Sequence, residues 1–460
     1  MAKPHHREEY IYLAGLTHDS VIIAWGAFFF KKKGNGKFKL VDDEDLGDYN
    51  PGRKSSIGFG SESYGRATVE VFDRNGTRIA MGETSDNHYE VKELSPETTY
   101  TYRIIVDNKV WAGGSLNIFY EKRKRFLPDP SIYRNEFTTF PAPNRAAELN
   151  FAVIGDFGKR SEIQYRVAQA IEKAVDEYGL QLMLTTGDNI YRKHIFNPEG
   201  GEDDDWLLTY FQPYRHVINR IPVFPCIGNH DADESEDQDD RSQLYTNFYA
   251  DQRFPDSIDG SIFPGLFYRF RYGSDIEFIC LDTSKAKKSE LPSGDNFRGR
   301  FYEHPKHRAF LENIMAETSG AKWRIPFSHH PPYSKGSDHD DTKEGLYELA
   351  DEFHRFGVRA FFSGHSHTFQ HFTRTQAAGQ SHYFVSGGGG DPKSVDLSER
   401  SRGDLRHYGN RKEGHFLVVR IRNDEMEVIP IGEFRGSLRS ISVRDENRQP
   451  FDMPITFTLN

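Results

Sequence analysis

From residue 149 onward, the chain alternates short apolar runs of strand type with segments of helical periodicity. The run LNFAVIGD, residues 149–156, is almost continuously apolar, as expected for a strand that is covered on both faces of its sheet. The segment SEIQYRVAQAIEKAVDEYG follows it, and Ser161 and Gln164 have the spacing of a helix capping box. Such alternation predicts a layered α/β domain, and the strand-rich residues after 414 are expected to add antiparallel strands to it.

Residues 8–140 differ in character, because their apolar runs are all of strand type. An Asn-Gly pair at 75–76 separates two of these runs and predicts a β-hairpin. The segment LSPETTY, which ends at Tyr100, resembles the tyrosine corner of fibronectin type III-like sandwiches. We therefore expect a small all-β sandwich, a proline-containing linker at 141–148 and a second domain at 149–460.

Five of the apolar runs end in polar clusters. These clusters are Gly155-Asp156, Gly187-Asp188, Gly228-Asn229-His230-Asp231, His329-His330 and Gly364-His365-Ser366-His367. Loops after the carboxyl ends of strands in an α/β sheet meet at one rim, where ligands bind. The glycines that precede most of these residues are expected to let the backbone turn sharply as it leaves each strand.

The polar clusters combine oxygen donors from aspartate and asparagine with nitrogen donors from histidine. This mixture suits iron, manganese or zinc better than calcium or magnesium, which prefer oxygen ligands alone. Taken singly, Asp156 has an ordinary explanation as a helix cap and Asn229 as a turn residue. Together, the clusters offer more ligands than one ion needs, so they predict two ions that share a bridging carboxylate.

The motifs GDFG, GDNIY, GNHD, HHPPY and GHSH, in this order, resemble those of the calcineurin-like metallophosphoesterases. The tyrosine of GDNIY, Tyr191, is similar to that of the purple acid phosphatase branch. The resemblance extends from about residue 149 to the C-terminus. It implies a layered metallophosphoesterase β-sandwich flanked by helices, preceded by a small all-β sandwich.

The resemblance also implies a ligand set. Fe(III) would be held by Asp156, Asp188, Tyr191 and His367, and a divalent zinc, manganese or iron ion by Asp188, Asn229, His329 and His365. A free phenol has a pKa of about 10, so only a strongly polarising ion such as Fe(III) holds a tyrosine as phenolate near neutral pH. The family spacing H-x-P selects His329 in HHPPY and leaves His330 for the substrate side or for packing, and His330 as the ligand is the alternative.

The implied reaction is hydrolysis of phosphate monoesters by in-line attack of a metal-bound hydroxide. His230 would hydrogen-bond the phosphoryl oxygens or protonate the leaving alkoxide, and Asp231 would orient it and raise its pKa. His339 lies near the offset at which some family members place a substrate-binding histidine, and an exposed loop position is the alternative. His371 and His382 lie outside the motifs and are expected to be surface or packing residues.

Two other functions fit the same sequence. A wider pocket would favour phosphodiesters or phospho-anhydrides, and the sequence does not show pocket width. A non-catalytic binding protein on this fold is the alternative from another class, although the complete ligand set argues against it. The small phosphorylated substrate, the oligomeric state and the role of residues 8–140 are not identified by the sequence.

The composition of the chain limits the classes of partner that we expect. The 460 residues carry a formal net charge of −10 without a concentrated basic footprint, so we expect no nucleic-acid partner. No apolar run approaches the roughly 18 residues that span a bilayer, and no secretory signal is visible, so a cytoplasmic protein is expected, with secretion of a trimmed precursor as the alternative. The two cysteines, Cys226 and Cys280, are expected to be buried free thiols.

Overall fold

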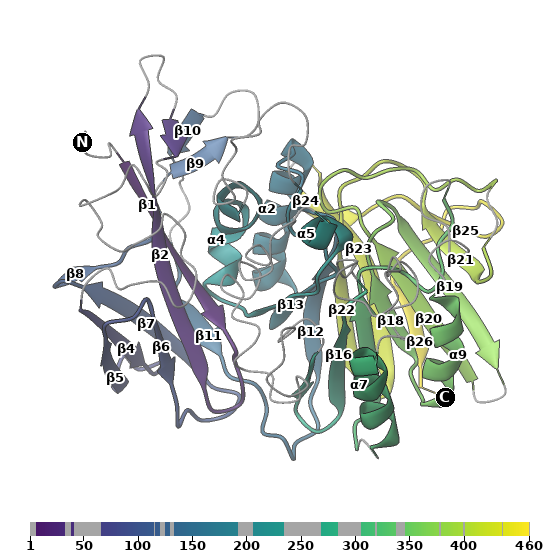
Figure 1. Cartoon of the computed structure of the whole chain (residues 1–460), viewed down its shortest axis with the longest axis horizontal. Helices are drawn as coiled ribbons and strands as arrows, with labels where there is room; N and C mark the ends of the chain where they lie inside the picture. Colours follow the sequence, from purple (N-terminus) through teal and green to yellow (C-terminus); the bar gives the residue numbers. More distant parts are fainter. Residues whose placement is uncertain are drawn as a thin grey trace.

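The computed structural model describes most of the chain (Figure 1). The described residues are 6–32, 38–40, 66–114, 116–119, 125–128, 133–191, 206–233, 268–283, 305–317, 320–336, 346–376, 379–398, 401–434 and 436–459. His339, a predicted substrate contact, lies outside them. Within these ranges, no helix has both the length and the apolar character needed to cross a membrane.

The N-terminal part is built from strands alone among its described residues. They are β1 (His6–Ala14), β2 (Val21–Lys32), β3 (Phe38–Leu40), β4 (Ala67–Phe72), β5 (Arg78–Thr84), β6 (His88–Val91), β7 (Thr99–Val106), β8 (Lys109–Val110), β9 (Leu116–Phe119), β10 (Arg125–Pro128) and β11 (Glu136–Thr138). The predicted hairpin is confirmed, because residues 75–76 join β4 to β5 and the Gly76 N–H donates to the Asp73 carbonyl at 3.0 Å. The hydroxyl oxygen of Tyr100 accepts a hydrogen bond from the Ser95 N–H at 2.9 Å, as the tyrosine-corner pattern predicts.

The strand pair β1–β2 lies between the sheet β11-β7-β4-β5 and helix α4 (Figure 1), and its apolar side chains are buried on both faces. One face, which includes Ile11 and Trp25, packs with Ile104 and other apolar residues of the sheet β11-β7-β4-β5. The opposite face carries Tyr10 and Tyr12, whose rings contact that of Phe211 beside helix α4. Burial on both faces explains why the two runs are almost continuously apolar, and it joins the N-terminal strands to the rest of the molecule.

The remaining elements form the α/β part predicted from the sequence. They are β12 (Leu149–Ile154), α2 (Glu162–Glu177), β13 (Leu182–Thr185), the π-helical turn η2 (Leu207–Phe211), α4 (Gln212–Ile218), β14 (Val223–Phe224), α5 (Asn229–Asp233), β15 (Tyr268–Tyr272), β16 (Ile276–Leu281), α7 (Pro305–Ala316), β17 (Trp323–Ser328), α9 (Tyr347–Arg355), β18 (Ala360–Ser363), β19 (Phe369–Gln376), β20 (Gly379–Ser386), β21 (Asp404–Gly409), β22 (Phe416–Arg422), β23 (Glu425–Phe434), β24 (Ser437–Ser440), β25 (Val443–Asp445) and β26 (Ile455–Thr458). The predicted linker, residues 141–148, falls between β11 and β12.

These strands make two sheets that pack face to face. One has the order β14-β13-β12-β22-β23-β24 with β26 on β23, and the other has the order β15-β16-β17-β18-β20-β19-β21-β25. Phe151 of β12 meets Phe278 of β16 and Phe362 of β18 between the sheets, with ring centroids 5.2 and 5.9 Å apart. Helices α2 and α4 cover the outer face of the first sheet, and α7 and α9 that of the second. The predicted C-terminal strands are confirmed, because β22 pairs antiparallel with β12.

Helix α2 begins where the sequence predicts it. The Ser161 hydroxyl oxygen accepts from the Gln164 N–H at 3.0 Å and caps the helix. The capping box is formed only in part, since the Gln164 side-chain oxygen accepts from the Arg160 N–H at 2.7 Å rather than from the N–H of Ser161. The cap fixes the loop between β12 and α2, which carries Asp156.

Candidate metal centre

The five polar clusters meet at one end of the molecule, but they come from both sheets. Asp156, Asp188 and Asn229 follow β12, β13 and β14 of the first sheet, whereas His329 and His365 follow β17 and β18 of the second. The sequence pattern predicted that these clusters lie at the rim of a single sheet. The structure places the site at the common edge of two packed sheets, because parallel strands of both layers end there.

Asp156, Tyr191 and His367 form one group of donor atoms. The Tyr191 hydroxyl lies 3.2 Å from Asp156 Oδ1 and 3.0 Å from His367 Nε2. His367 Nε2 and Asp156 Oδ1 are 3.5 Å apart. The structure thus brings together three donors from three loops, all of them predicted from the sequence to lie in one half-site.

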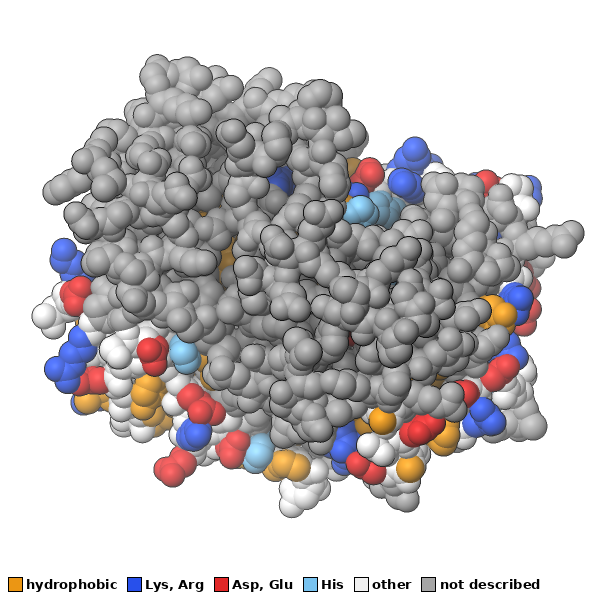
Figure 2. All heavy atoms as spheres, viewed as in Figure 1, with side chains coloured by type: hydrophobic (Ala, Val, Ile, Leu, Met, Phe, Trp, Pro, Cys, Tyr) orange, Lys and Arg blue, Asp and Glu red, His pale blue; other side chains and the backbone are white. Residues whose placement is uncertain are grey.

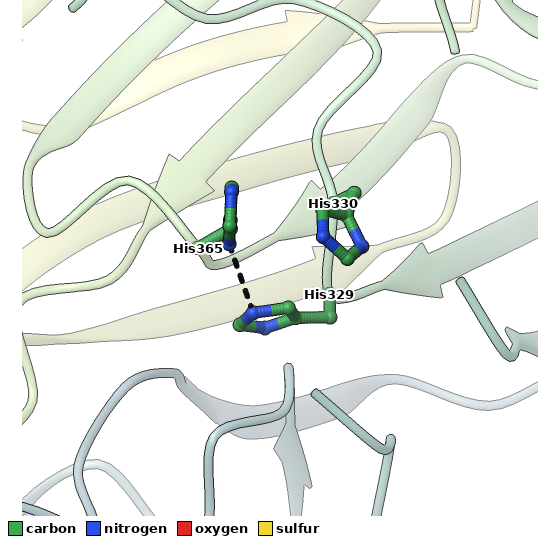
Figure 3. Close-up of side chains that lie close together, drawn as sticks. All are labelled: His329, His330 and His365. Carbon is green, nitrogen blue, oxygen red and sulfur yellow. Dashed lines mark hydrogen bonds between the residues drawn. The ribbon is translucent and has the colours of Figure 1, made fainter. Parts of the chain in front are cut away.

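Asn229, His329 and His365 form a second group. Asn229 Oδ1 lies 2.9 Å from His329 Nε2 and 3.0 Å from His365 Nδ1, and the two histidine nitrogens are 3.1 Å apart. Figure 3 shows the His329 and His365 rings approaching each other from different loops, with His330 beside them. The structure thus brings together three of the four residues that the sequence predicts as ligands of a divalent ion.

Asp188 lies between the two groups. Its Oδ1 is 3.4 Å from His329 Nε2 of the second group, and its carboxylate interacts with the Tyr191 hydroxyl of the first. The same Oδ1 accepts a hydrogen bond from the His230 backbone N–H at 2.9 Å. Asp188 is thus the carboxylate in position to bridge two ions.

Backbone carbonyls fix the orientation of two of the histidine rings. His329 Nδ1 lies 2.7 Å from the Thr186 carbonyl oxygen, and His367 Nδ1 lies 3.0 Å from that of Asp391. A carbonyl only accepts, so each Nδ1 carries the proton and each Nε2 presents a lone pair to the cluster. Outer partners of this kind are typical of metal-ligating histidines.

The ligand loops hold unusual backbone conformations. Asp156, Asp188 and His365 have φ values of 56°, 52° and 67°, a left-handed region that costs non-glycine residues roughly 1–3 kcal/mol each. The expected glycine turn is present at Gly187, whose φ is 85°. Gly228 instead permits close packing, because a Cβ there would lie 2.2 Å from the Asp188 backbone nitrogen. Strain at three ligand residues is the pattern of a functional site rather than of ordinary loops.

The buried carboxylates of Asp156 and Asp188 favour a positive charge at the cluster. Burial, followed by the charge of Asp188, raises the pKa of Asp156 well above its ordinary value. Burial and the same two carboxylates also raise the pKa of Tyr191, so its ionisation requires a strongly polarising cation. Burial, followed by the charges of Lys159 and Lys393, lowers the pKa of His367 to about 4, which keeps the ring neutral and able to ligate. The donor types, their convergence and these shifts fit a dinuclear metal centre.

His230 and Asp231 stand at the edge of the cluster. The His230 side chain is half-buried, and its ring centroid lies 4.4 Å from that of Tyr191. The Asp231 carboxylate accepts hydrogen bonds from the backbone N–H groups of Gly228 at 2.7 Å, Ile190 at 3.1 Å and Asn189 at 3.3 Å. Asp231 thereby ties the GDNIY loop to the GNHD loop, a role that the sequence analysis did not anticipate.

His330 lies next to the second group rather than within its shortest contacts. Its Nδ1 and backbone N–H lie 2.9 and 3.0 Å from the Thr283 hydroxyl oxygen, and its ring centroid is 4.3 Å from that of His365. His329 has the shorter contacts to Asn229 and His365, which favours it as the ligand over His330. Sequence reasoning missed Thr283, although it follows β16 directly in the same manner as the other polar clusters.

Two further partners carried no sequence signal. The carbonyls of Thr186 and Asp391 orient histidine rings, and any residue type supplies a carbonyl. Lys159 also lies at the site without a predicted role: its Nζ is 3.2 Å from the centre of the Tyr191 ring. Burial lowers the pKa of Lys159, while the carboxylates of Asp188 and Asp156 act in the opposite direction.

Comparison with known families agrees with this geometry. Residues 149–369 match the family described as calcineurin-like phosphoesterases. Purple acid phosphatase 17 of Arabidopsis thaliana is 24% identical over 320 residues, which cover 65% of this chain and 85% of the relative. Purple acid phosphatase 4 of the same plant is 23% identical over 316 residues, with the same coverage. Residues 149–369 are therefore similar to calcineurin-like phosphoesterases, and the chain has purple acid phosphatase relatives at 23–24% identity.

Solved structures show the same fold over nearly the whole chain. The structure of PhoD has a TM-score of 0.60 at 13% identity and covers 95% of this chain and 90% of its own. The purple acid phosphatase PPD1 from yellow lupin (Lupinus luteus) has a TM-score of 0.58 at 14% identity and covers 98% of this chain and 74% of its own. At these identities the likeness establishes the fold, here a metallophosphoesterase domain preceded by N-terminal β-sheets.

Proposed function

We propose that this metal-dependent phosphoesterase is a purple acid phosphatase-like enzyme that hydrolyses phosphate monoesters. The observation that carries the proposal is the convergence of the two donor groups on either side of Asp188, with neighbouring donor atoms 2.9–3.5 Å apart. The names of the plant relatives and the tyrosine in the first group support the same branch.

The residues divide into two half-sites. Asp156, Tyr191 and His367 would hold Fe(III), Asn229, His329 and His365 would hold a zinc, manganese or iron(II) ion, and Asp188 would bridge them. When bound, two such ions neutralise the charge of a phosphate ester and lower the pKa of water to about 7. The protein keeps the Nε2 atoms of His329 and His367 unprotonated through the carbonyl contacts described above.

His230 has the position for the proton-transfer step. It directly follows the ligand Asn229, its backbone N–H is fixed on Asp188, and its half-buried ring can reach a ligand that enters from solvent. There it would hydrogen-bond the phosphoryl oxygens and protonate the departing alkoxide. Asp231 supports this step by holding together the two loops that carry Tyr191 and His230.

The N-terminal strands are proposed to be a fibronectin type III-like domain. The Tyr100–Ser95 hydrogen bond and the packing of two sheets against each other support this assignment. Because β1 and β2 also pack on Phe211 and α4, the domain would support the outer face of the catalytic sheet rather than bind a ligand of its own.

The test compares metal content with substrate preference. Purified protein loaded with iron and zinc is assayed on p-nitrophenyl phosphate and on bis(p-nitrophenyl) phosphate, alongside the isosteric variant Asp188→Asn. We expect two ions per chain, a higher kcat/KM on the monoester and loss of both ions and activity in the variant. If the protein binds two ions but prefers the diester, the assignment as a monoesterase is wrong. If the protein takes up no metal, the assignment as a metal-dependent enzyme is wrong.

A further inference from the structure

Lys159 is a charged residue at the metal centre that none of the ligand motifs explains. It lies three positions after Asp156, in the loop between β12 and α2, and its side chain is only partly accessible to solvent. Its Nζ stands 3.2 Å from the centre of the Tyr191 ring. The ammonium group therefore lies against the face of the aromatic ring whose hydroxyl belongs to the first donor group.

A cation over an aromatic face is attracted by the negative charge of the π-system. The attraction grows when the phenol ionises, because part of the phenolate charge is delocalised over the ring. The Tyr191 side chain is buried, and its hydroxyl lies 3.2 Å from Asp156 Oδ1, whereas Lys159 contacts the ring face. The lysine charge therefore acts on the ring rather than through a contact with the hydroxyl.

We propose that Lys159 is a positioning residue that places a positive charge on the ring face of Tyr191 and so tunes the electronic state of this tyrosine when it binds iron. The inference rests on the proposed function, in which Tyr191 binds Fe(III). An ammonium group beside the phenolate lowers the energy of the electrons that the ring would transfer to the ion. Lys159 therefore raises the energy of the phenolate-to-iron charge-transfer transition.

The test reads the visible spectrum of iron-loaded protein, a signal separate from catalytic turnover. The variants are Lys159→Met, which removes the charge, and Lys159→Arg, which keeps it. Lys393→Met is the matched control, because Lys393 is a second lysine at the site whose backbone N–H donates to the His367 carbonyl and whose charge acts on His367. Each band is normalised to bound iron, and circular dichroism confirms that each variant is folded.

We expect the charge-transfer band to move to longer wavelength in Lys159→Met, to stay near its wild-type position in Lys159→Arg, and to shift less in Lys393→Met than in Lys159→Met. An intact band at the wild-type wavelength in Lys159→Met would overturn the inference, and so would an equal shift in Lys159→Arg, since the charge would then not be the cause. A wild-type protein that binds iron without any such band would overturn the iron–tyrosinate assignment itself, and this inference with it. The wild-type spectrum thus distinguishes the two failures.

Discussion

The molecule contains two groups of histidines that are buried or, at His407, half-buried, and the two groups differ in their surroundings. The rim histidines are His329, His365 and His367, which lie at the end of the two sheets. The interior row consists of His371, His382 and His407, which lie on β19, β20 and β21. In both groups histidine nitrogens come within about 3 Å of a second histidine or a phenol.

The interior row is a chain of hydrogen-bonded rings. His371 Nδ1 lies 2.8 Å from His407 Nδ1, and His371 Nε2 lies 3.0 Å from His382 Nδ1. The three rings are nearly parallel, and the ring of Phe457 stacks on that of His382 with centroids 3.7 Å apart. His371 uses both of its nitrogens within the row, so it presents no lone pair to a shared ion.

The difference shows what separates a metal ligand from a packing histidine. At the rim, Nδ1 of His329 and of His367 is engaged by a carbonyl, and Nε2 faces carboxylates, an amide or a phenol. In the interior, the nitrogens bond to one another between aromatic rings. Within the described part of the chain, the sets of three His, Cys, Asp or Glu side chains spaced to hold an ion are His329-His330-His365 and Asp156-Asp188-His329, both at the rim. Convergence of donor atoms on one small volume, rather than the presence of histidine, marks the site.

The largest expected effect on activity comes from replacing a rim histidine with phenylalanine, a substitution that is also applied to the interior row below. His329→Phe removes a ligand of the second ion, and even loss of an outer-shell partner typically lowers metal affinity by about 10–100-fold. We expect the variant to lose the divalent ion and nearly all phosphatase activity while it keeps iron. Elemental analysis of both metals checks this, and retention of both ions would remove His329 from the ligand set.

A smaller loss is expected at His230, which stands beside the ligands without joining them. His230→Ala should retain both ions and lower kcat by about 10²–10⁴-fold, the usual contribution of a positioned general acid. Steady-state kinetics on p-nitrophenyl phosphate, together with metal analysis, measure the two properties separately. If the variant lost its ions, the residue would have to be reassigned as a ligand.

In the interior row, the matched substitution is expected to affect stability instead of metal content. His371→Phe keeps a flat ring beside Phe384 but removes the hydrogen-bond partner that His382 and His407 share. Each buried polar group left without a partner lowers the free energy of unfolding by about 1–3 kcal/mol. Urea unfolding measures the loss, and both ions should remain bound. A drop in metal content here would contradict the contrast between the two groups.

The smallest expected effect is the pH dependence of the stability that the interior row contributes. Burial, followed by the neighbouring His407, lowers the pKa of His382 to about 3, below the value of about 6.5 in an unfolded chain. The stabilisation by the neutral ring is therefore complete above about pH 6.5 and is lost as the pH falls toward 3. Between pH 7.5 and pH 4.5 this amounts to about 2–3 kcal/mol.

The His382→Phe variant isolates that effect, because its ring cannot bind a proton and still stacks on Phe457. Its free energy of unfolding should fall less between pH 7.5 and pH 4.5 than that of the wild type, measured by urea unfolding under identical metal loading. Equal slopes for the two proteins would show that the row contributes nothing to acid sensitivity.

The surface offers a further contrast with these buried groups. Acidic and basic side chains of the described residues are intermixed along the lower edge of the face in Figure 2. Exposed ion pairs, such as Arg166–Glu162, contribute little to stability, at most about 1 kcal/mol each. The two groups of histidines are therefore better places to perturb function and folding.

The sequence by itself determined the order of elements and the chemistry of the rim. The sequence predicts where strands end and loops begin, because apolar periodicity is a local property and glycines often mark its end. Such transitions precede Asp156, Asp188, Asn229, His329 and His365. The same local information predicted the N-cap at Ser161 and the hairpin at residues 75–76. The side chains that meet at the rim could be proposed from the sequence because most of them lie within a few residues of a strand end.

Tertiary structure decided what depends on contacts between distant segments. Only packing shows that the ligands come from two sheets, that Asp231 ties two loops together, that Thr186 and Asp391 orient histidine rings, and that Lys159 lies over Tyr191. His371 and His382 carry no local signal for their row, because their partner on β21 is some 25–36 residues away. Carbonyl contacts, ring faces and cross-strand neighbours do not depend on residue spacing, so no pattern in the chain records them.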